Sequence, residues 1–227
     1  IMFGNVLFFG RQNCKYSNLL KKYLKNNSKK LIYIESKKKK EKLNLVKIKS
    51  ITIDFIFCFR SFYILKSNLI KRSKYGVINF HPGIPKYRGV GAVNFAIYED
   101  NKYYGSTAHY IDNHLIDKGE IIDVSKFQLK KFSTIEETLK NTHSRMYLQS
   151  KKIIKNFLKD NFYYLKNKKT KKYVWSKKLY TSKDLNNLYE IKVKFKESKI
   201  KKIIRATYTE KYKPYIKIDN QKYYLTK

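Results

Sequence analysis

Hydrophobic residues in the first half of the chain form short runs, and the stretches between several of these runs carry hydrophobic residues at helical spacing. The runs that predict strands are Asn5–Phe9, Leu31–Ile34, Ile51–Phe59 and Val77–Phe80. The stretches that predict helices are Tyr16–Leu24 and Leu65–Ser73. Short strands that alternate with helices are typical of a parallel sheet, and the nearly unbroken apolar run Ile51–Phe59 suits a central strand. We therefore predict an α/β fold.

The pattern continues beyond position 90 and ends in a long helix. Ala92–Tyr98 predicts a helix, Ser106–Ile111 a strand, and Glu120–Leu129 either one strand or two short ones. Hydrophobic residues then recur at helical spacing from Ile135 to about Leu158. The preceding Ser133-Thr134-Ile135-Glu136 has the form of a capping box, which predicts that Ser133 caps the first turn.

The last part of the chain has a different composition. Beyond Asn161 the sequence is polar, rich in lysine and irregular. Strand character returns at Ile200–Thr207, Tyr215–Ile218 and Tyr223–Leu225, and the last two runs flank a turn and predict a β-hairpin. We therefore expect a core of residues 1–165 and a C-terminal extension of residues 166–227 that ends in this hairpin.

The composition indicates a protein that folds without disulfide bonds or structural metal ions. A chain of 227 residues with 42% hydrophobic content can bury a large core. Cys14 and Cys58 lack the spacing of a disulfide framework or a metal site, so we interpret them as small core residues of a cytoplasmic protein. The first residues show no export signal and no apolar run long enough to cross a membrane, so we expect a soluble protein without a membrane partner.

The net charge of +35 brings nucleic acid into consideration, because such an excess attracts phosphate backbones. Lysine far outnumbers arginine, however, and is spread along the chain together with Ile, Asn and Tyr. This distribution favours a compositional bias over a localised binding stripe, and we interpret the runs Lys37–Lys40 and Lys168–Lys172 as solvated turns. No Gly-x-Gly-x-x-Gly follows the first strand, so a dinucleotide fingerprint is absent.

Three polar residues are candidates for chemistry. Asn79 and His81 fall at the end of a predicted strand, where their spacing places both side chains on one side and at the sheet edge that binds ligands. An amide and an imidazole there offer a donor to an oxyanion and a group that moves protons. Asp117, from a later loop, is suited to orient the imidazole. Each residue alone is equally consistent with a structural or solvated role.

The loop after His81 and two further histidines also have residue types that suit a ligand site. Pro82, Gly83, Pro85 and Gly89 form a rigid turn that holds Lys86, Tyr87 and Arg88, and two cations beside an aromatic ring suit a phosphate and a sugar or base. The alternative is an ordinary surface turn. We expect His109, within a predicted strand, to be a core residue, and His114 to lie in a loop near the pocket mouth. Neither has a partner at metal-ligand spacing, so we predict no metal.

Taken together, these residues resemble the folate-dependent formyltransferase family. The chain supplies Asn79-Phe80-His81-Pro82, then Ile84-Pro85-Lys86-Tyr87-Arg88-Gly89, then Asp117-Lys118-Gly119, in the order and approximate spacing of that family. The resemblance covers about Val6–Leu158 and implies a Rossmann-like core, 10-formyltetrahydrofolate as co-substrate, and Asn79, His81 and Asp117 as catalytic residues. Lys118 stands where a small threonine is common in the family.

The resemblance also implies ligand contacts. The residues implied to bind folate are Ser61, Phe62, Ile64, Leu65, Asp112 and Asn113. The residues implied to bind a nucleotide-sugar are Arg11, Lys86, Tyr87 and Arg88.

Within the family, Gly91–Ile97, Gly105–Tyr110 and the tail look most like small N-formyltransferases that modify nucleotide-linked amino sugars for surface polysaccharide. This resemblance implies a homodimer paired through the C-terminal β-element. It favours dTDP-4-amino-4,6-dideoxyglucose as the acceptor, followed by the 3-amino isomer. Formylation of methionyl-tRNA is the alternative reaction, disfavoured by the short tail. An alternative of another class is a catalytically inactive, basic α/β module that binds nucleic acid.

Overall fold

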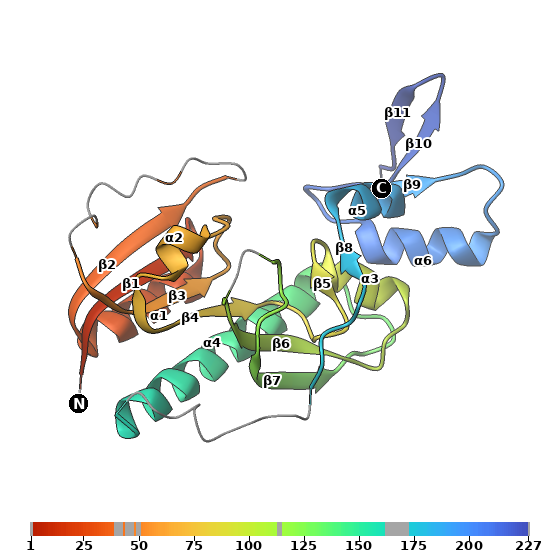
Figure 1. Cartoon of the computed structure of the whole chain (residues 1–227). Helices are drawn as coiled ribbons and strands as arrows, with labels where there is room; N and C mark the ends of the chain where they lie inside the picture. The colour runs from red at the N-terminus through yellow and green to blue at the C-terminus, as the bar shows by residue number, and fades with distance from the viewer. Residues whose placement is uncertain are drawn as a thin grey trace.

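The computed structural model describes residues 2–38, 43, 48, 51–112, 115–161 and 173–226. Its centre is a six-stranded sheet with the strand order β2-β1-β3-β4-β6-β7 (Figure 1). The strands are β1 (Phe3–Arg11), β2 (Ser28–Ser36), β3 (Ile53–Phe59), β4 (Ser73–His81), β6 (Tyr103–Tyr110) and β7 (Ile121–Gln128). The first four pair in parallel, and β6 and β7 run antiparallel. The predicted α/β fold with a mostly parallel sheet is therefore confirmed.

Helices cover both faces of this sheet. The helices α1 (Lys15–Asn26) and α4 (Ile135–Lys159) pack on one face, where Phe55 and Phe57 lie in their core cluster. The short helix α2 (Ser67–Ile70) packs on the other face, against Ile56 and Cys58. Alternate residues of β3 thus enter two different cores, which explains why nearly the whole strand is apolar. Both cysteines are buried and free.

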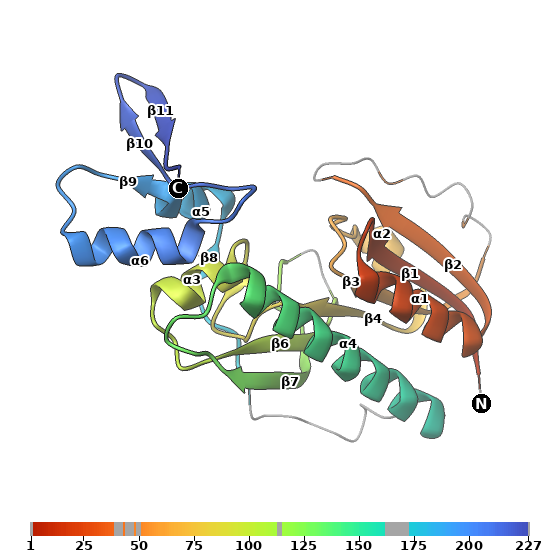
Figure 2. The same cartoon turned by 180° about the vertical axis from the view of Figure 1, so that it is seen from behind.

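The C-terminal elements form a smaller unit at the α3 end of the core (Figures 1 and 2). Its helices are α5 (Ser182–Tyr189) and α6 (Glu197–Thr207), and its sheet contains β9 (Glu190–Ile191), β10 (Tyr215–Ile218) and β11 (Gln221–Tyr224). Asn94 of α3 (Ala92–Tyr98) donates to the carbonyl of Ala206 in α6 at 2.7 Å, a buried contact. The hairpin β10-β11, as predicted, projects away from the core in both views.

Two sequence predictions about this architecture were wrong. Ile200–Thr207 was expected to be a strand because isoleucine and threonine favour strands, but these residues belong to the helix α6. Their buried members, Ile203, Ala206 and Thr207, lie three and four apart, and this stripe packs on α3. The helix expected at Leu65–Ser73 is limited to the four residues of α2, because β4 already begins at Ser73.

Helix caps also differ from expectation. The predicted cap of α4 is off by one residue: Thr134, not Ser133, caps the helix and accepts a hydrogen bond from the Glu137 N–H. A complete capping box occurs instead at α5, where Thr181 and Asp184 satisfy each other's backbone N–H groups. Neither α5 nor its cap was predicted, because its surroundings are polar and lack a long apolar repeat. The predicted turn at Lys168–Lys172 lies outside the described residues, as do Lys39 and Lys40 of the other lysine run.

The cap of α4 can be tested by stability. We expect Thr134→Ala to lower the free energy of unfolding by about 1 kcal/mol, because the Glu137 N–H loses its acceptor. Urea denaturation followed by circular dichroism measures this change. Ser133→Ala is the matched control and should have a smaller effect, since Ser133 makes no capping hydrogen bond. The reverse order of the two effects would contradict this assignment.

Candidate active site

Four polar side chains meet at the carboxyl end of β4. His81 Nδ1 lies 3.2 Å from Asp117 Oδ2, and His109 Nε2 lies 3.4 Å from Asp117 Oδ1. Asn79 Nδ2 lies 3.0 Å from His109 Nε2. His81, His109 and Asp117 are buried, and Asn79 is half-buried. The structure thus brings together all three residues predicted from the sequence and adds a fourth, His109. We call these four residues the polar cluster.

His109 was expected to be an ordinary core residue. It is buried, but it reaches the cluster because β4 and β6 pair with Asn79 directly opposite His109. Its Nδ1 donates to the carbonyl of Tyr110 at 2.8 Å, and its Nε2 lies between the Asn79 amide and the Asp117 carboxylate. The register of two antiparallel strands cannot be read from residue types alone, so the sequence offered no sign of this contact.

His81 is held between two acceptors. Its Nε2 donates to the carbonyl of Tyr87 at 2.8 Å, and its Nδ1 faces the Asp117 carboxylate. Because a carbonyl and a carboxylate can only accept, this arrangement suits an imidazole that carries a proton on both nitrogens. Both N–H groups of His81 are thus directed at acceptors of the protein, and a ligand oxygen would have to replace the Tyr87 carbonyl to accept from Nε2.

Asp117 is fixed in an unusual backbone conformation. Its φ is 45°, in the left-handed region that non-glycine residues seldom adopt. Its carboxylate accepts the Gly89 N–H at 2.9 Å. Burial alone would raise the pKa of Asp117, but the charge of His81 and the contacts with His109 and Gly89 outweigh burial, and the pKa lies well below the usual range. Asp117 is consequently a carboxylate at neutral pH.

Arg88 holds the Asp117 loop in place. Its Nε donates to the carbonyl of Asp117 at 2.6 Å, Nη2 to that of Ile116 at 2.9 Å, and Nη1 to that of Ser176 at 2.9 Å. The guanidinium is buried and its donors are directed at the protein. Three of its five N–H groups are thus used on protein carbonyls. These contacts make Arg88 a brace for the polar cluster.

The neighbours of Arg88 are also engaged within the protein. Tyr87 is fully buried and its hydroxyl donates to Glu99 at 2.9 Å, so it offers no ring face to a nucleotide, contrary to the prediction. Lys86 is half-exposed and pairs with the same carboxylate at 2.8 Å. Tyr180 donates to the other oxygen of Glu99 at 2.8 Å. Of the three predicted residues, only Lys86 remains available to a ligand.

A positively charged cluster lies at the ends of β1 and β3. The Arg11 guanidinium carbon lies 3.8 Å from the Phe62 ring centroid, and its Nε is buried with no hydrogen-bond partner among the described residues. Burial and the charge of Arg60 lower the pKa of Arg11 to about 10. Burial and the charges of Arg60 and Arg11 lower the pKa of His143 to about 3, so His143 is neutral here. The charges of Arg11 and Arg60 interact, and neither forms an ion pair with a carboxylate among the described residues, which suits an anionic ligand.

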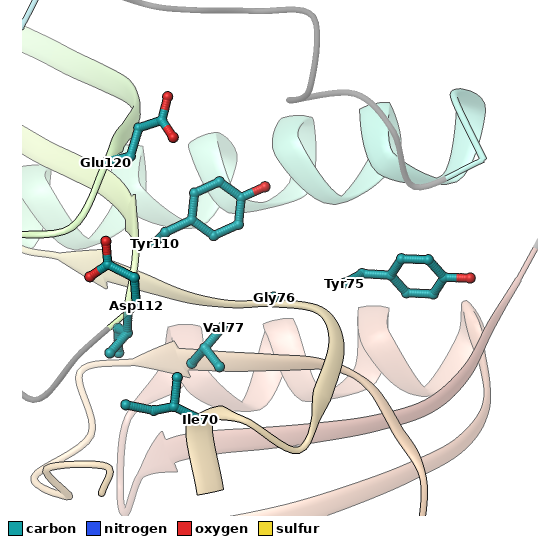
Figure 3. Close-up of a pocket in the computed structure, with 8 residues that line it drawn as sticks. Ile70, Tyr75, Gly76, Val77, Tyr110, Asp112 and Glu120 are labelled. Atoms are coloured by element: carbon teal, nitrogen blue, oxygen red, sulfur yellow. The ribbon is translucent and has the colours of Figure 1, made fainter. Parts of the chain in front are cut away.

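The predicted folate-binding residues form two groups. Ser61, Phe62, Ile64 and Leu65 follow β3, where Leu65 is buried and Ile64 is largely exposed. Asp112 lies after β6 and lines a pocket of about 290 Å³ with Val77, Ile70 and Ile111 (Figure 3). Ile70, Val77, Leu65 and Ile111 belong to one hydrophobic cluster, so the two groups adjoin. Asn113 lies outside the described residues, as does His114.

The pocket is lined by residues from both faces of the sheet. Val77 shares one face of β4 with Asn79 and His81, whereas Tyr75 and Tyr110 pack against the core cluster on the α1 and α4 face. Figure 3 shows Tyr110, Asp112 and Glu120 at the polar side of the pocket and Ile70 beside Val77 at its apolar side. An apolar pocket with a few convergent polar groups is the usual form of a small-molecule site.

No group of three or more metal-ligating side chains occurs among the described residues. No described helix is long and apolar enough to cross a membrane.

Comparison with known proteins identifies the family. The family model of the formyl transferases matches residues 8–154, which is more than half of the chain. The chain belongs to the formyl transferase family. The family predicted from Asn79-Phe80-His81-Pro82 and the motifs that follow is thereby confirmed, and the matched region contains the whole polar cluster.

Curated relatives of this formyl transferase act on different acceptors. The methionyl-tRNA formyltransferase of Clostridium tetani is 33% identical over 91 residues, 40% of this chain and 29% of that protein. The phosphoribosylglycinamide formyltransferase of Haemophilus influenzae is 30% identical over 125 residues, 52% of this chain and 58% of that protein. The chain therefore spans less than two thirds of either relative.

Solved structures match over a greater length. A 4-N formyltransferase from Francisella tularensis has a TM-score of 0.74 at 20% identity and covers 97% of this chain and 96% of that chain. An N-formyltransferase from Helicobacter canadensis, solved with folinic acid and dTDP-3-aminofucose, has a TM-score of 0.72 at 22% identity over 96% and 85%. At such identities the likeness establishes the fold alone, and this shared fold includes the C-terminal unit of the formyl transferase.

The bracing role of Arg88 predicts a stability effect. Arg88→Lys keeps the charge but cannot reproduce three directed hydrogen bonds, so we expect the free energy of unfolding to fall by about 3 kcal/mol. Lys86→Met, which removes a partly exposed ion pair two residues away, should cost at most about 1 kcal/mol. Urea denaturation of both variants makes the comparison. Equal effects would show that Arg88 is not a brace.

Proposed function

We propose that this formyl transferase moves a formyl group from 10-formyltetrahydrofolate to the amine of a nucleotide-linked amino-dideoxy sugar. The observation that carries the proposal is the polar cluster, in which Asn79, His81 and Asp117 meet at a strand end of the family's fold. Proteins of this type would serve surface polysaccharide synthesis. We further propose that the three residues are the catalytic ones.

The mechanism follows from the donors in the cluster. The sugar amine attacks the formyl carbon, a C–N bond forms, and the carbonyl oxygen becomes an oxyanion. The contact with His109 Nε2 fixes the plane of the Asn79 amide, whose N–H group then donates to the oxyanion. His81, held by Asp117, supplies a second donor by exchanging its bond to the Tyr87 carbonyl.

The intermediate then collapses. The bond between the formyl carbon and the folate nitrogen breaks. His81 gives a proton to that nitrogen and then takes up the proton lost by the amine, or a water held by Asp117 carries the proton between the two nitrogens. The two bound reactants replace a bimolecular encounter, and this proximity supplies effective molarities on the order of 10⁵ M or more. The buried carboxylate keeps the imidazole oriented throughout.

We propose separate binding sites for the two substrates. The pterin would enter the pocket near Asp112, with the rest of the folate along Ser61–Leu65, because apolar and polar groups converge there. The diphosphate would meet Arg11 and Arg60, whose charges lack a carboxylate partner. Lys86 is exposed enough to assist.

The acceptor is proposed as dTDP-4-amino-4,6-dideoxyglucose, with the 3-amino isomer next. Support comes from the similarity of the fold, including the C-terminal unit, to a 4-N formyltransferase and to a protein solved with dTDP-3-aminofucose. Methionyl-tRNA is the second candidate acceptor, favoured by the sequence relatives and by the positive charge.

Mass spectrometry of the products tests the reaction. The protein is incubated with 10-formyltetrahydrofolate and a panel of dTDP- and UDP-linked amino sugars, and we expect the favoured sugar to gain one formyl group. Asn79→Ala should lower kcat by on the order of 10²-fold, because an oxyanion donor is lost. Asn187→Ala, on an exposed position of α5, is the control and should leave kcat unchanged.

Other outcomes separate the alternatives. Formylation of methionyl-tRNA without any gain on the sugars would replace the proposed acceptor. Failure of folate to raise the melting temperature would indicate a nucleic-acid-binding module without this activity, since ligand at 100 times its Kd should stabilise the fold by about 2.7 kcal/mol. An Asn79→Ala enzyme with wild-type turnover would contradict the catalytic assignment.

We also propose that the protein is a homodimer paired through β10-β11. The hairpin exposes Ile218, Tyr223 and Tyr224, each by more than half, on strands that project from the core. Ile218 and Tyr223 share one face of the hairpin and Tyr224 lies on the other. Exposed apolar side chains on a projecting element are typical of an interface. In this proposal residues 1–165 form the catalytic core and residues 166–227 form the extension that pairs the subunits.

Analytical ultracentrifugation tests whether the protein is a dimer. We expect the wild type to sediment as a dimer and the double variant Ile218→Ser, Tyr223→Ser as a monomer, because the apolar contact area is lost. Val193→Ser removes a more exposed apolar side chain outside the hairpin and should remain dimeric. A monomeric wild type, or a dimeric double variant, would contradict this interface.

A further inference from the structure

A segment of the C-terminal part crosses the loop that precedes α3. We call residues 173–181 the strap. Ser176 N–H donates to the carbonyl of Pro85 at 3.0 Å, and the Arg88 guanidinium donates to the carbonyl of Ser176. Further along, β8 (Leu179–Tyr180) pairs in parallel with β5 (Arg88–Gly89). The strap is thus bound to the same loop that supplies the partners of His81 and Asp117.

Trp175 carries the strap into the polar cluster. Its ring centroid lies 5.0 Å from that of His109 and 6.0 Å from that of His81, both in edge-to-face arrangements. The indole N–H donates to the carbonyl of Gly119 at 2.7 Å, which fixes the plane of the ring. The indole is half-buried and contacts both imidazoles from one side.

Gly119 links this contact back to Asp117. It lies two residues beyond Asp117, so the indole hydrogen bond tethers the far end of the short segment that Arg88 braces at Ile116 and Asp117. One residue of the strap therefore contacts the two histidines and the loop of their carboxylate partner. No residue of the strap was predicted from the sequence to take part in the site.

We propose that Trp175 is a positioning residue for formyl transfer: it holds the imidazoles of His81 and His109 against Asp117 and keeps water away from them on the strap side. This inference rests on the proposed function. A hydrogen bond between a buried carboxylate and an imidazole strengthens when water is excluded. A small shift of the imidazole is costly to catalysis, because the donors must remain aimed at the oxyanion.

The proposal makes the C-terminal part necessary for chemistry in addition to any role in subunit pairing. The strap leads directly into α5 through Thr181, which caps that helix. The hydrogen bond of Tyr180 to Glu99 fixes the other end of the strap to the core. The site is accordingly incomplete without residues beyond the long helix α4.

Kinetics of three variants test the role. Trp175→Ala should lower kcat by on the order of 10- to 100-fold with little change in KM for either substrate, because the substrates still bind but the imidazoles lose their support. Trp175→Phe retains ring contact and should recover most of kcat. Val174→Ala, at the exposed neighbouring position of the strap, should match the wild type. Thermal melting of each variant verifies that the protein is folded.

Fluorescence gives a readout independent of turnover. Trp175 is the only tryptophan in the sequence, so the emission of the intact protein reports this position alone. We expect emission blue-shifted from that of the unfolded chain, and a change in intensity when His109 is replaced in His109→Gln. Emission typical of an exposed indole that does not respond to this change would overturn the docking of the strap.

The outcomes separate the two proposals. A wild-type protein that formylates no sugar contradicts the proposed function, whatever Trp175 does. An active wild type with a folded Trp175→Ala variant of equal kcat overturns the positioning role alone. A raised KM for the sugar at unchanged kcat would also overturn it, since Trp175 would then act in binding.

Discussion

A buried carboxylate needs partners, and the polar cluster of this protein is organised around Asp117 and the groups that contact it. Its side chain meets His81, His109 and the Gly89 N–H, and its backbone carbonyl accepts from Arg88. These contacts offset the free-energy cost of burying the charge and stabilise the left-handed backbone of Asp117. A strained backbone of this kind persists only where the surrounding contacts hold it. If any partner moved, both the charge and the loop conformation of Asp117 would lose support.

The partners come from parts of the chain that are far apart in sequence, which makes the fold a condition for the site. Gly89 follows the loop after β4 and adopts a φ of 86°, and an added Cβ there would collide with the carbonyl of Tyr180 in the strap. The close approach of the two backbones is possible only because this residue is glycine. The strap in turn depends on Glu99, which accepts hydrogen bonds from Tyr87 and Tyr180. Loop, strap and carboxylate are therefore mutually dependent.

The sequence was sufficient for features that depend on local pattern. Alternating apolar runs identified the parallel strands and α4, and the order of Asn79, His81 and Asp117 identified the family. It was insufficient for features that depend on tertiary contacts. Ile200–Thr207 forms a helix because α3 offers a surface for its stripe, and His109 joins the cluster because of strand register. Arg88 and Tyr87 were assigned to a ligand because their residue types suit one, whereas burial directs their polar groups inward.

The same reasoning bears on the large positive charge. Most lysines are on the surface, where a charge interacts weakly with its neighbours and is screened by salt. The cations that can act on a ligand are the few that are partly buried and lack a carboxylate, and Arg11 with its unpartnered Nε is the clearest among the described residues. Specific recognition of a diphosphate would therefore come from the Arg11 and Arg60 pair near the sheet edge, and the remaining charge would raise the rate at which any anion approaches. Net charge alone thus favours an anionic substrate without distinguishing a nucleotide-sugar from tRNA, and the distinction falls to the geometry of the site.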